Sequence, residues 1–317
     1  MSKLLTFCIL TYRNFDGIFD TLSSLFEQDY PQIELIISDD GSPNYGEYID
    51  GIKQFVEGNK KSNIIDVRYN RMDPNVGTVK HLNAVFSMAK GEYIKDLGAG
   101  DTLNCQDALT KYVNYLEQND CDICFARMRG VRPNGEYVFH LAACEDNYDL
   151  LRSLTVEQTL NRLFARNFLP APAWCGKKEL FEKYGYYSEN TKLIEDYPYW
   201  IHLCRQGVQF GYMDDRLIDY RLDGVSSGGF YSEKFMDDMV AIYQNCIFPY
   251  DRRYGIMQPF YNWLKKMGLN AYYAKARWTR YSLREKTVAY LKYGLFFLYI
   301  LWGNYKYKRM NQRGKSA

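Results

Sequence analysis

Residues 33–42 read Ile-Glu-Leu-Ile-Ile-Ser-Asp-Asp-Gly-Ser, and they combine a buried strand with a polar turn. The first five residues are mostly apolar and have the length of a strand, which ends abruptly in the acidic turn. Further strands are predicted at the apolar run 4–10, at 64–69 and, after Gly91, at 92–95. Apolar residues at helical spacing lie between the runs, at 15–28, 48–56 and 77–88. Strands that alternate with helices predict a mostly parallel, buried sheet flanked by helices.

Polar residues follow each of the four predicted strands. They are grouped at 11–13, 39–41, 71–75 and 98–101. Ligands of such sheets bind beyond the carboxyl ends of the strands, so we expect the four groups to form one site. The carboxylates in these groups, without histidine, suit a hard divalent cation with oxygen ligands beside a phosphate.

Several enzyme classes are disfavoured because their motifs are missing. Residues 98–103 begin like a dinucleotide-binding motif, but Leu103 stands where the third glycine is needed. The sequence holds no Walker loop and no Gly-x-Ser-x-Gly turn. Cys121 and Cys124 form the one Cys-x-x-Cys pair, and we expect a buried strand there, since a zinc site needs four ligands. Unpaired buried thiols indicate a reducing compartment, hence a cytoplasmic protein.

The charge of the chain is unevenly distributed. The 317 residues are 47% hydrophobic and 25% charged, as in ordinary globular proteins, and the net charge is +2. Residues 252–317 hold 15 Lys/Arg and one acid, Glu285, so this region carries +14 and residues 1–251 carry −12. Its longest uncharged stretch, 293–305, is 13 residues long. That is short of the roughly 20 residues that a spanning helix needs.

Taken in order, the strand-end motifs and two later segments resemble the family 2 glycosyltransferases of the GT-A fold. The resemblance covers about 1–227 and rests on residues 5–14, 21–31, 33–42, 75–83, 91–101, 194–200 and 220–227. It implies an α/β fold with a Rossmann-like, mostly parallel sheet. We expect a nucleotide-sugar-binding half at 1–101, an acceptor-binding half at 102–227 and a basic, aromatic, helical C-terminal extension at 228–317.

The family resemblance implies transfer of a sugar from a nucleotide donor, usually a UDP-sugar, with inversion at the anomeric carbon. A carboxylate that accepts the imide N–H of uracil explains base preference, since a wrong base leaves it unpaired. We expect this role for Asp40. The residues predicted to bind the nucleotide are Thr11, Tyr12, Arg13, Asp40, Gly41, Asn75, Gly77, Lys80 and Gly100. For Lys80, a solvated lysine on a helix is an equally good interpretation.

The acidic metal-binding run of the family is reduced in this chain. Where relatives have Asp-x-Asp-Asp, residues 98–101 read Gly-Ala-Gly-Asp, so Asp101 alone matches the last acid. Mg²⁺ or Mn²⁺ accepts water and diphosphate oxygens, so one or two protein carboxylates suffice. Asp223 stands where many relatives have a histidine, and it is the second predicted ligand. Its alternative role is to start a turn.

The resemblance assigns Asp196 as the general base. Direct displacement at the anomeric carbon needs a carboxylate near the acceptor hydroxyl. Glu195 is its neighbour, and consecutive helical residues point about 100° apart, so only one of the two should face the site. Trp174 and Trp200 are predicted to form walls that stack against sugars, with core packing as the alternative for Trp200.

Other interpretations stay open at this stage. One is a sugar nucleotidyltransferase, although a Gly-rich basic loop is missing after the first strand. Another is a degenerate, inactive domain that binds a partner, suggested by Gly98 and Gly100. Nucleic acid is not expected as a partner, because the acidic body repels phosphates. The basic region 252–317 suggests docking on the inner face of a membrane that carries a lipid-linked or glycan acceptor, as in polysaccharide assembly. Homodimerisation is the alternative.

Overall fold

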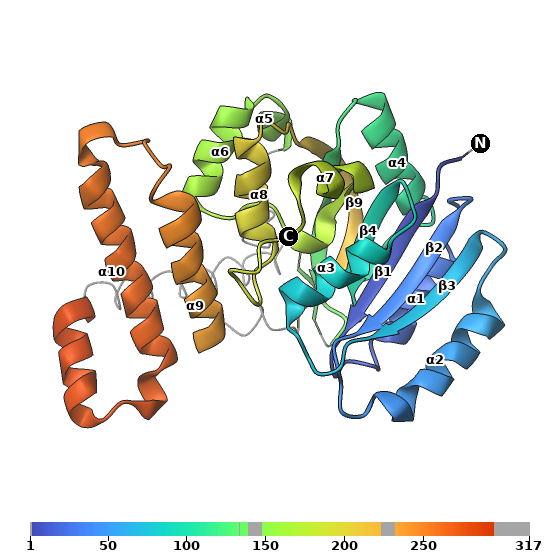
Figure 1. The fold of residues 1–317 in the computed structure, drawn as a ribbon, viewed down its shortest axis with the longest axis horizontal. Coiled ribbons are helices and arrows are strands. Elements are labelled where there is room, and N and C mark those ends of the chain that lie inside the picture. Colours follow the sequence, from blue (N-terminus) through green and yellow to red (C-terminus); the bar gives the residue numbers. More distant parts are fainter. Residues whose placement is uncertain (1, 133, 139–147, 223–231, 295–317) are drawn as a thin grey trace. The chain divides into compact units, whose positions relative to one another are not determined.

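The computed structural model describes residues 2–132, 134–138, 148–222 and 232–294 (Figure 1). The chain divides into two compact units. The first comprises residues 1–189 and 195–222, and the second comprises 190–194 and 223–317. The strands that we predicted to end at the site belong to the first unit, and Asp223 lies outside the described residues.

The first four strands form the parallel half of one sheet. They lie in the order β3-β2-β1-β4, and their bounds are β1 (Leu5–Thr11), β2 (Ile33–Asp39), β3 (Ile64–Arg71) and β4 (Tyr93–Gly98). The connecting helices are α1 (Ile18–Phe26), α2 (Tyr45–Asn59) and α3 (Thr78–Met88). This alternation confirms the predicted α/β class. Thr11 pairs with Asp39, and Leu10 pairs with Gly98, so three strands end at one level.

The sheet continues with strands of mixed direction. Among the described residues it holds nine strands, and the later ones are β5 (Thr102–Leu103), β6 (Ile123–Val131), β7 (Tyr137–Val138), β8 (Trp174–Lys177) and β9 (Gly211–Arg221). The helices between them are α4 (Ala108–Gln118), α5 (Tyr148–Arg152), α6 (Val156–Ala165), α7 (Lys178–Tyr184) and α8 (Asp196–Arg205). Cys124 is buried in β6, as predicted for that segment.

A short 3-10 turn spans Ala171–Ala173, with Pro170 as its N-cap residue and Pro172 in its first turn. Proline is compatible with the first turn of a helix, because the N–H that it lacks has no partner there.

Both faces of the sheet are covered. On one face, alternate residues of β1, β2 and β4 pack with α1, α2 and α4 in a single apolar cluster. On the other, Phe86 of α3 lies 5.7 Å from Trp174 and 5.1 Å from Phe181, between ring centroids. Figure 1 shows α3 in front of the strands. Polar groups at the carboxyl ends of the strands are left outside these two apolar layers.

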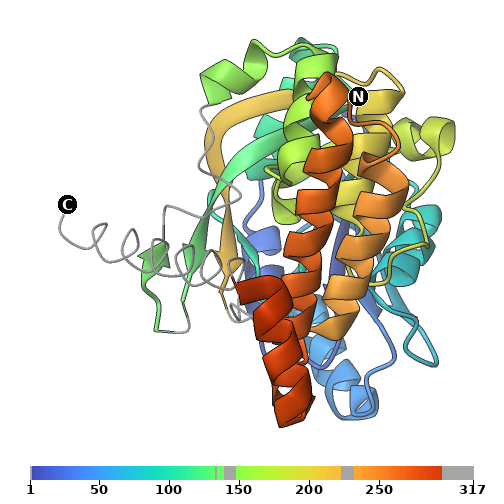
Figure 2. The same ribbon diagram turned by 90° about the vertical axis from the view of Figure 1, so that its left-hand side faces the viewer.

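Residues 232–294 of the second unit are mostly helical, as the composition of the C-terminal region predicts. Its described helices include α9 (Glu233–Ile242) and α10 (Gln258–Ala276), and residues 283–294 are also helical. Figure 2 shows α9 and α10 side by side. Tyr273 near the end of α10 donates a hydrogen bond to Asp237 of α9 at 2.9 Å. Of the helices in the described ranges, none has the length and apolar character to cross a membrane.

Candidate functional site

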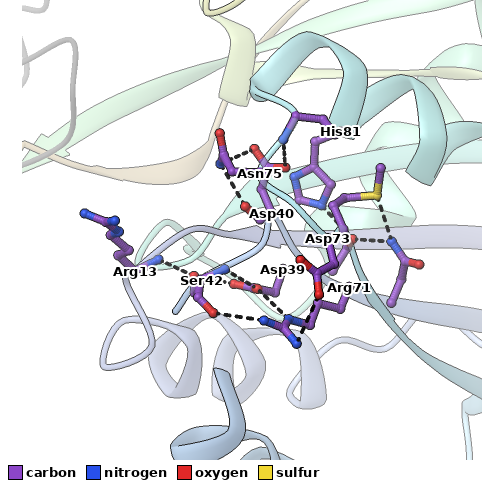
Figure 3. A network of polar contacts seen from close by, with 12 residues as sticks. Arg13, Asp39, Asp40, Ser42, Arg71, Asp73, Asn75 and His81 are labelled. Atoms are coloured by element: carbon purple, nitrogen blue, oxygen red, sulfur yellow. Dashed lines mark hydrogen bonds and ion pairs between the residues drawn. The ribbon is translucent and has the colours of Figure 1, made fainter. Parts of the chain in front are cut away.

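The ends of β1 and β2 are joined by hydrogen bonds between their turns. The Asp40 N–H donates to the carbonyl of Thr11 at 2.9 Å. The Arg13 N–H donates to the Ser42 hydroxyl at 2.8 Å (Figure 3). Arg13 has a φ of 59°, a left-handed conformation that is uncommon for residues other than glycine. The predicted groups at 11–13 and 39–41 therefore lie together.

The two carboxylates of the acidic turn have different partners. Asp39 is 1% exposed and accepts hydrogen bonds from the backbone N–H of Ser42 at 2.7 Å and from its hydroxyl at 2.5 Å. It closes its own turn, as aspartate commonly does. Asp39 is therefore a structural residue, and Asp40 is the one that turns towards the next loop.

Asp40 binds the loop that precedes α3. Its carboxylate accepts hydrogen bonds from the side chain of Asn75 at 2.7 Å and from the backbone N–H groups of Val76 at 2.9 Å and Gly77 at 3.0 Å (Figure 3). A carboxylate offers about four lone-pair positions, so acceptor capacity remains for one more donor. The predicted grouping of 39–41 with 71–75 is thus present.

Gly41 is required at this contact. Its φ is +73°, and a Cβ there would lie 2.6 Å from the nitrogen of Asn75, closer than such atoms approach. Any side chain would push the 75–77 loop away from Asp40. The glycine therefore allows the two loops to touch.

His81 lies beneath this network and was missed from the sequence. It is buried on α3, and its Nε2 lies 2.6 Å from the Ser38 hydroxyl, which also accepts a hydrogen bond from Asn70 at 2.9 Å. Burial lowers the pKa of His81 below 6.5, and the carboxylates of Asp40 and Asp39 oppose that shift. The Ser38 hydroxyl thus links β2 to His81 of α3 and to Asn70 of β3.

Asp101 lies at the end of β4 and is 8% exposed. Its Oδ1 accepts a hydrogen bond from the N–H of Arg221 at 2.9 Å, and its carbonyl accepts one from Thr21 at 2.8 Å. Gly100 has a φ of +107°, and a Cβ there would lie 2.9 Å from Cδ of Arg221. The end of β9 therefore reaches Asp101, and Asp223, two residues further along the chain, lies outside the described residues.

The side chains at this end of β4 supply part of the ligand set that a divalent cation needs. Asp101 supplies a carboxylate, a hard oxygen ligand of the kind that Mg²⁺ and Mn²⁺ prefer. Within the described ranges, no group of three or more His, Cys, Asp or Glu could hold a metal ion. An ion at Asp101 would therefore need most of its ligands from a bound diphosphate, from water or from Asp223.

Asp196 is the first residue of α8. Its Oδ2 accepts a hydrogen bond from the Asn167 side chain at 2.9 Å, and its Oδ1 accepts one from the N–H of Tyr197 at 2.7 Å. Burial raises the pKa of this carboxyl, and the hydrogen bond from Asn167 opposes the shift. Glu195 precedes the helix as its N-cap residue.

Two predicted sugar-stacking residues are core residues instead. Trp174 is 1% exposed and Trp200 is fully buried, with their ring centroids 6.3 Å apart in an aromatic cluster. No face of either indole is open to a sugar. The expectation of a wall at Trp174 and Trp200 is therefore wrong. Core packing, the alternative for Trp200, holds for that residue, and Trp174 is a core residue as well.

The remaining predicted residues are more exposed. Tyr12 is 43% exposed, and the guanidinium of Arg13 lies 5.0 Å from the centroid of its ring. The side chain of Lys80 is 57% exposed, and its Nζ lies 3.5 Å from a carboxylate oxygen of Glu189. Lys80 thus has the environment of a solvated helix lysine.

A buried cation near the site was also missed. Lys95 of β4 is fully buried and donates hydrogen bonds to the carbonyls of Asp96 and Pro172, the second at 2.9 Å. Burial lowers the pKa of Lys95, and it raises the pKa of the neighbouring Asp96 carboxyl to about 6. The signal in the sequence was a Lys-Asp pair inside an otherwise apolar strand.

Residues 6–185 match the model of the family described as Glycosyl transferase family 2. Since this match spans more than half of the chain, the chain belongs to that family. An uncharacterized glycosyltransferase of Haemophilus influenzae is 23% identical over 80% of this chain and 76% of its own length. The abequosyltransferase RfbV of Salmonella typhimurium is 28% identical over 40% of this chain and 37% of its own length.

Solved structures support the GT-A fold. The mannosyltransferase PcManGT from Pyrobaculum calidifontis, in complex with GDP-Man and Mn²⁺, has a TM-score of 0.61 and 15% identity, with 95% of this chain and 84% of that one covered. TarS 1-349 from S. aureus, in complex with UDP-GlcNAc, has a TM-score of 0.56 and 17% identity, with 92% and 80% covered. At these identities, the likeness concerns the fold.

We predict that His81 stays neutral at pH 6.5. Between its lowered pKa and 6.5 the unfolded chain binds more protons than the folded one, so this residue makes the protein less stable as the pH falls through that window. An NMR titration of the imidazole signals measures the pKa. The chain has three histidines, and a His81→Gln variant assigns the signal. A titration at or above pH 6.5 would contradict the burial of this ring.

Proposed function

We propose that this chain transfers a sugar from a nucleoside diphosphate donor to a hydroxyl group of an acceptor, with inversion at the anomeric carbon. The observation that carries the proposal is the shared level of the strand ends that bear Thr11, Asp40 and Asp101. Nucleotides bind at such an edge of a parallel sheet. Structural neighbours in complex with UDP-GlcNAc and GDP-Man support a nucleotide-sugar as the donor.

In this proposal the base and ribose lie against the β1 and β2 turns, beside Thr11, Tyr12 and Gly41. The Asp40 carboxylate accepts a further hydrogen bond from the imide N–H of uracil, and this bond favours a UDP-sugar as the donor. Asn75 and Gly77 hold Asp40 in place, and their hydrogen bonds to it support this role. Arg13 and Lys80 are long exposed cations that we assign to the phosphates.

We assign Asp101, Gly100 and Asp223 to the diphosphate and its cation, which is Mn²⁺ or Mg²⁺. When bound, such an ion neutralises charge that grows on the leaving diphosphate. Asp101 would hold the ion, and the neighbouring Gly98 places no side chain against it, since even a Cβ there would lie 3.6 Å from Oδ2 of Asp101. The Mn²⁺ in the PcManGT complex supports a cation in this role.

We assign Asp196 as the general base for the acceptor hydroxyl, with Glu195 beside the acceptor. Partial burial raises the pKa of Asp196, which makes the carboxylate a better proton acceptor near neutral pH. Its hydrogen bonds with Asn167 and Tyr197 fix its orientation. Asp196 takes the hydroxyl proton as the acceptor oxygen attacks the anomeric carbon and the bond to the diphosphate breaks.

Two alternatives remain distinguishable by assay. A sugar nucleotidyltransferase would form a nucleotide-sugar from a nucleoside triphosphate and a sugar phosphate. A degenerate domain, suggested by Gly98 and Gly100, would bind a donor without hydrolysing or transferring its sugar. The family match favours sugar transfer over both.

We also propose that the second unit docks on an anionic membrane surface. Near the start of α10, large apolar side chains are exposed to solvent, namely Ile256 by 95%, Met257 by 56%, Phe260 by 53% and Trp263 by 52%. Arg252 and Lys266 are exposed in the same segment. Apolar and tryptophan side chains beside cations are typical of interfacial segments, and each cation contributes about 1 kcal/mol near anionic lipid. An acceptor on a lipid carrier, as in polysaccharide assembly at the inner face of a membrane, would make such docking useful.

We predict that Asp196→Asn lowers turnover by about a hundredfold or more, because the amide cannot take the acceptor proton. The donor is first selected by a thermal-shift screen of nucleotide-sugars with Mn²⁺, and turnover is then measured as release of the nucleoside diphosphate. UDP affinity should stay unchanged in this variant. Asp215→Asn, at an exposed residue of β9, serves as the matched control. Normal turnover by Asp196→Asn would remove this residue from the mechanism.

We predict that the chain cosediments with vesicles containing phosphatidylglycerol and much less with pure phosphatidylcholine. Replacing Ile256 and Phe260 by serine should weaken binding about tenfold or more, since two large apolar side chains no longer enter the interface. Ile65→Ser, at a residue that is 55% exposed in the first unit, is the control. Unchanged vesicle binding, together with a change from dimer to monomer by light scattering, would instead support homodimerisation through this patch.

A further inference from the structure

A buried carboxylate of the second unit binds the backbone directly ahead of Asp196. Asp238 lies on α9 and is 4% exposed. Its Oδ2 accepts hydrogen bonds from the N–H groups of Lys192 at 2.9 Å, Leu193 at 2.6 Å and Ile194 at 3.0 Å. Its Oδ1 accepts a second bond from Lys192 at 3.0 Å. Three consecutive backbone donors thus converge on one side chain.

This arrangement fixes a segment that has no regular secondary structure of its own. Residues 190–194 form neither helix nor strand, so their N–H groups have no ladder partners. Consecutive N–H groups that converge on an anion form a nest, and hydrogen bonds to a charged acceptor are stronger than neutral ones. The Asp238 carboxylate therefore holds this stretch of backbone in one conformation.

The segment leads directly into the proposed catalytic helix. Ile194 is bonded to Glu195, and Asp196 is the next residue and the first of α8. A general base must be held within about 0.5 Å of its working position, and a displacement of about 1 Å costs on the order of a hundredfold in rate. The backbone that carries the base is thus anchored two residues before it.

We propose that Asp238 is a positioning residue for Asp196, a role that rests on the proposed function. It contacts neither donor nor acceptor, and it acts through the backbone of residues 192–194. α9 lies outside residues 6–185, the part of the chain that matches the family model. The C-terminal unit therefore contributes to sugar transfer through this anchor, in addition to any docking role.

The test compares Asp238→Ala and Asp238→Asn with Asp237→Asn. Asp237 immediately precedes Asp238 on the same helix and is exposed, and its carboxylate accepts a hydrogen bond from Tyr273 at 2.9 Å. It therefore controls for charge and helix position. Asp238→Ala should lower kcat about tenfold or more. The Asn side chain keeps one acceptor oxygen but loses the charge. The kcat of Asp238→Asn should therefore lie between that of Asp238→Ala and that of the wild type.

Two further readouts separate positioning from general destabilisation. UDP affinity should stay at the wild-type value in both Asp238 variants, because the proposed nucleotide residues lie at the ends of β1, β2 and β4 and around the start of α3. Amide hydrogen exchange should rise in the peptide that spans 192–197 for Asp238→Ala and stay unchanged for Asp237→Asn. If Asp238→Ala does not fold, kcat, UDP affinity and hydrogen exchange are compared between Asp238→Asn and Asp237→Asn instead.

The inference is overturned if both Asp238 variants keep the wild-type kcat while Asp196→Asn loses turnover. It is equally overturned if kcat, UDP affinity and melting temperature fall together, since that pattern describes a stability role. A wild-type chain that transfers no sugar, or an Asp196→Asn variant with full turnover, would contradict the proposed function itself, and the positioning role would fall with it.

Discussion

The hydrogen bonds between the Asp40 carboxylate and the backbone of Val76 and Gly77 hold the candidate site together. They join the end of β2 to the start of α3, and through the Asp40 N–H they reach β1 as well. Gly41 exists at this point because a side chain would separate the two loops. With Asp40 fixed in this way, the edge of the sheet presents backbone and carboxylate groups in a defined arrangement before any ligand binds. That preorganisation lowers the entropic cost of binding.

The carboxylates of the first unit differ in environment, and the difference suits different tasks. Asp39 is buried and closes its own turn. Asp101 is 8% exposed, and its carboxylate accepts a hydrogen bond from the end of β9. Asp196 is partly buried, with a raised pKa and two hydrogen bonds that orient it. A carboxylate that stays charged beside phosphates and one that accepts a proton are the two kinds of group that the proposed reaction needs.

Local patterns predicted the strands, the helices and the grouping of the strand ends. They succeeded because apolar periodicity and the parallel topology are both encoded in nearby residues, as for residues 33–42 and for Asn75. Trp174 and Trp200 were misassigned because a large aromatic side chain suits both a sugar-binding wall and a core, and burial alone distinguishes the two. His81 and Asp238 could not be found, since their partners Ser38 and residues 192–194 lie more than 40 positions away in the sequence. Such contacts depend on the tertiary fold.

The central claim is that the carboxylate-bearing edge of the sheet binds a nucleoside diphosphate together with a cation. Calorimetric titration of UDP into the wild-type chain and into Asp101→Asn, each with and without Mn²⁺, tests it most directly. The account predicts that Mn²⁺ strengthens UDP binding to the wild type, and that Asp101→Asn retains the metal-free affinity but loses that gain. Equal strengthening by Mn²⁺ in both proteins would place the cation elsewhere, and a wild-type chain that binds no UDP under either condition would contradict the assignment of uracil nucleotides to this edge.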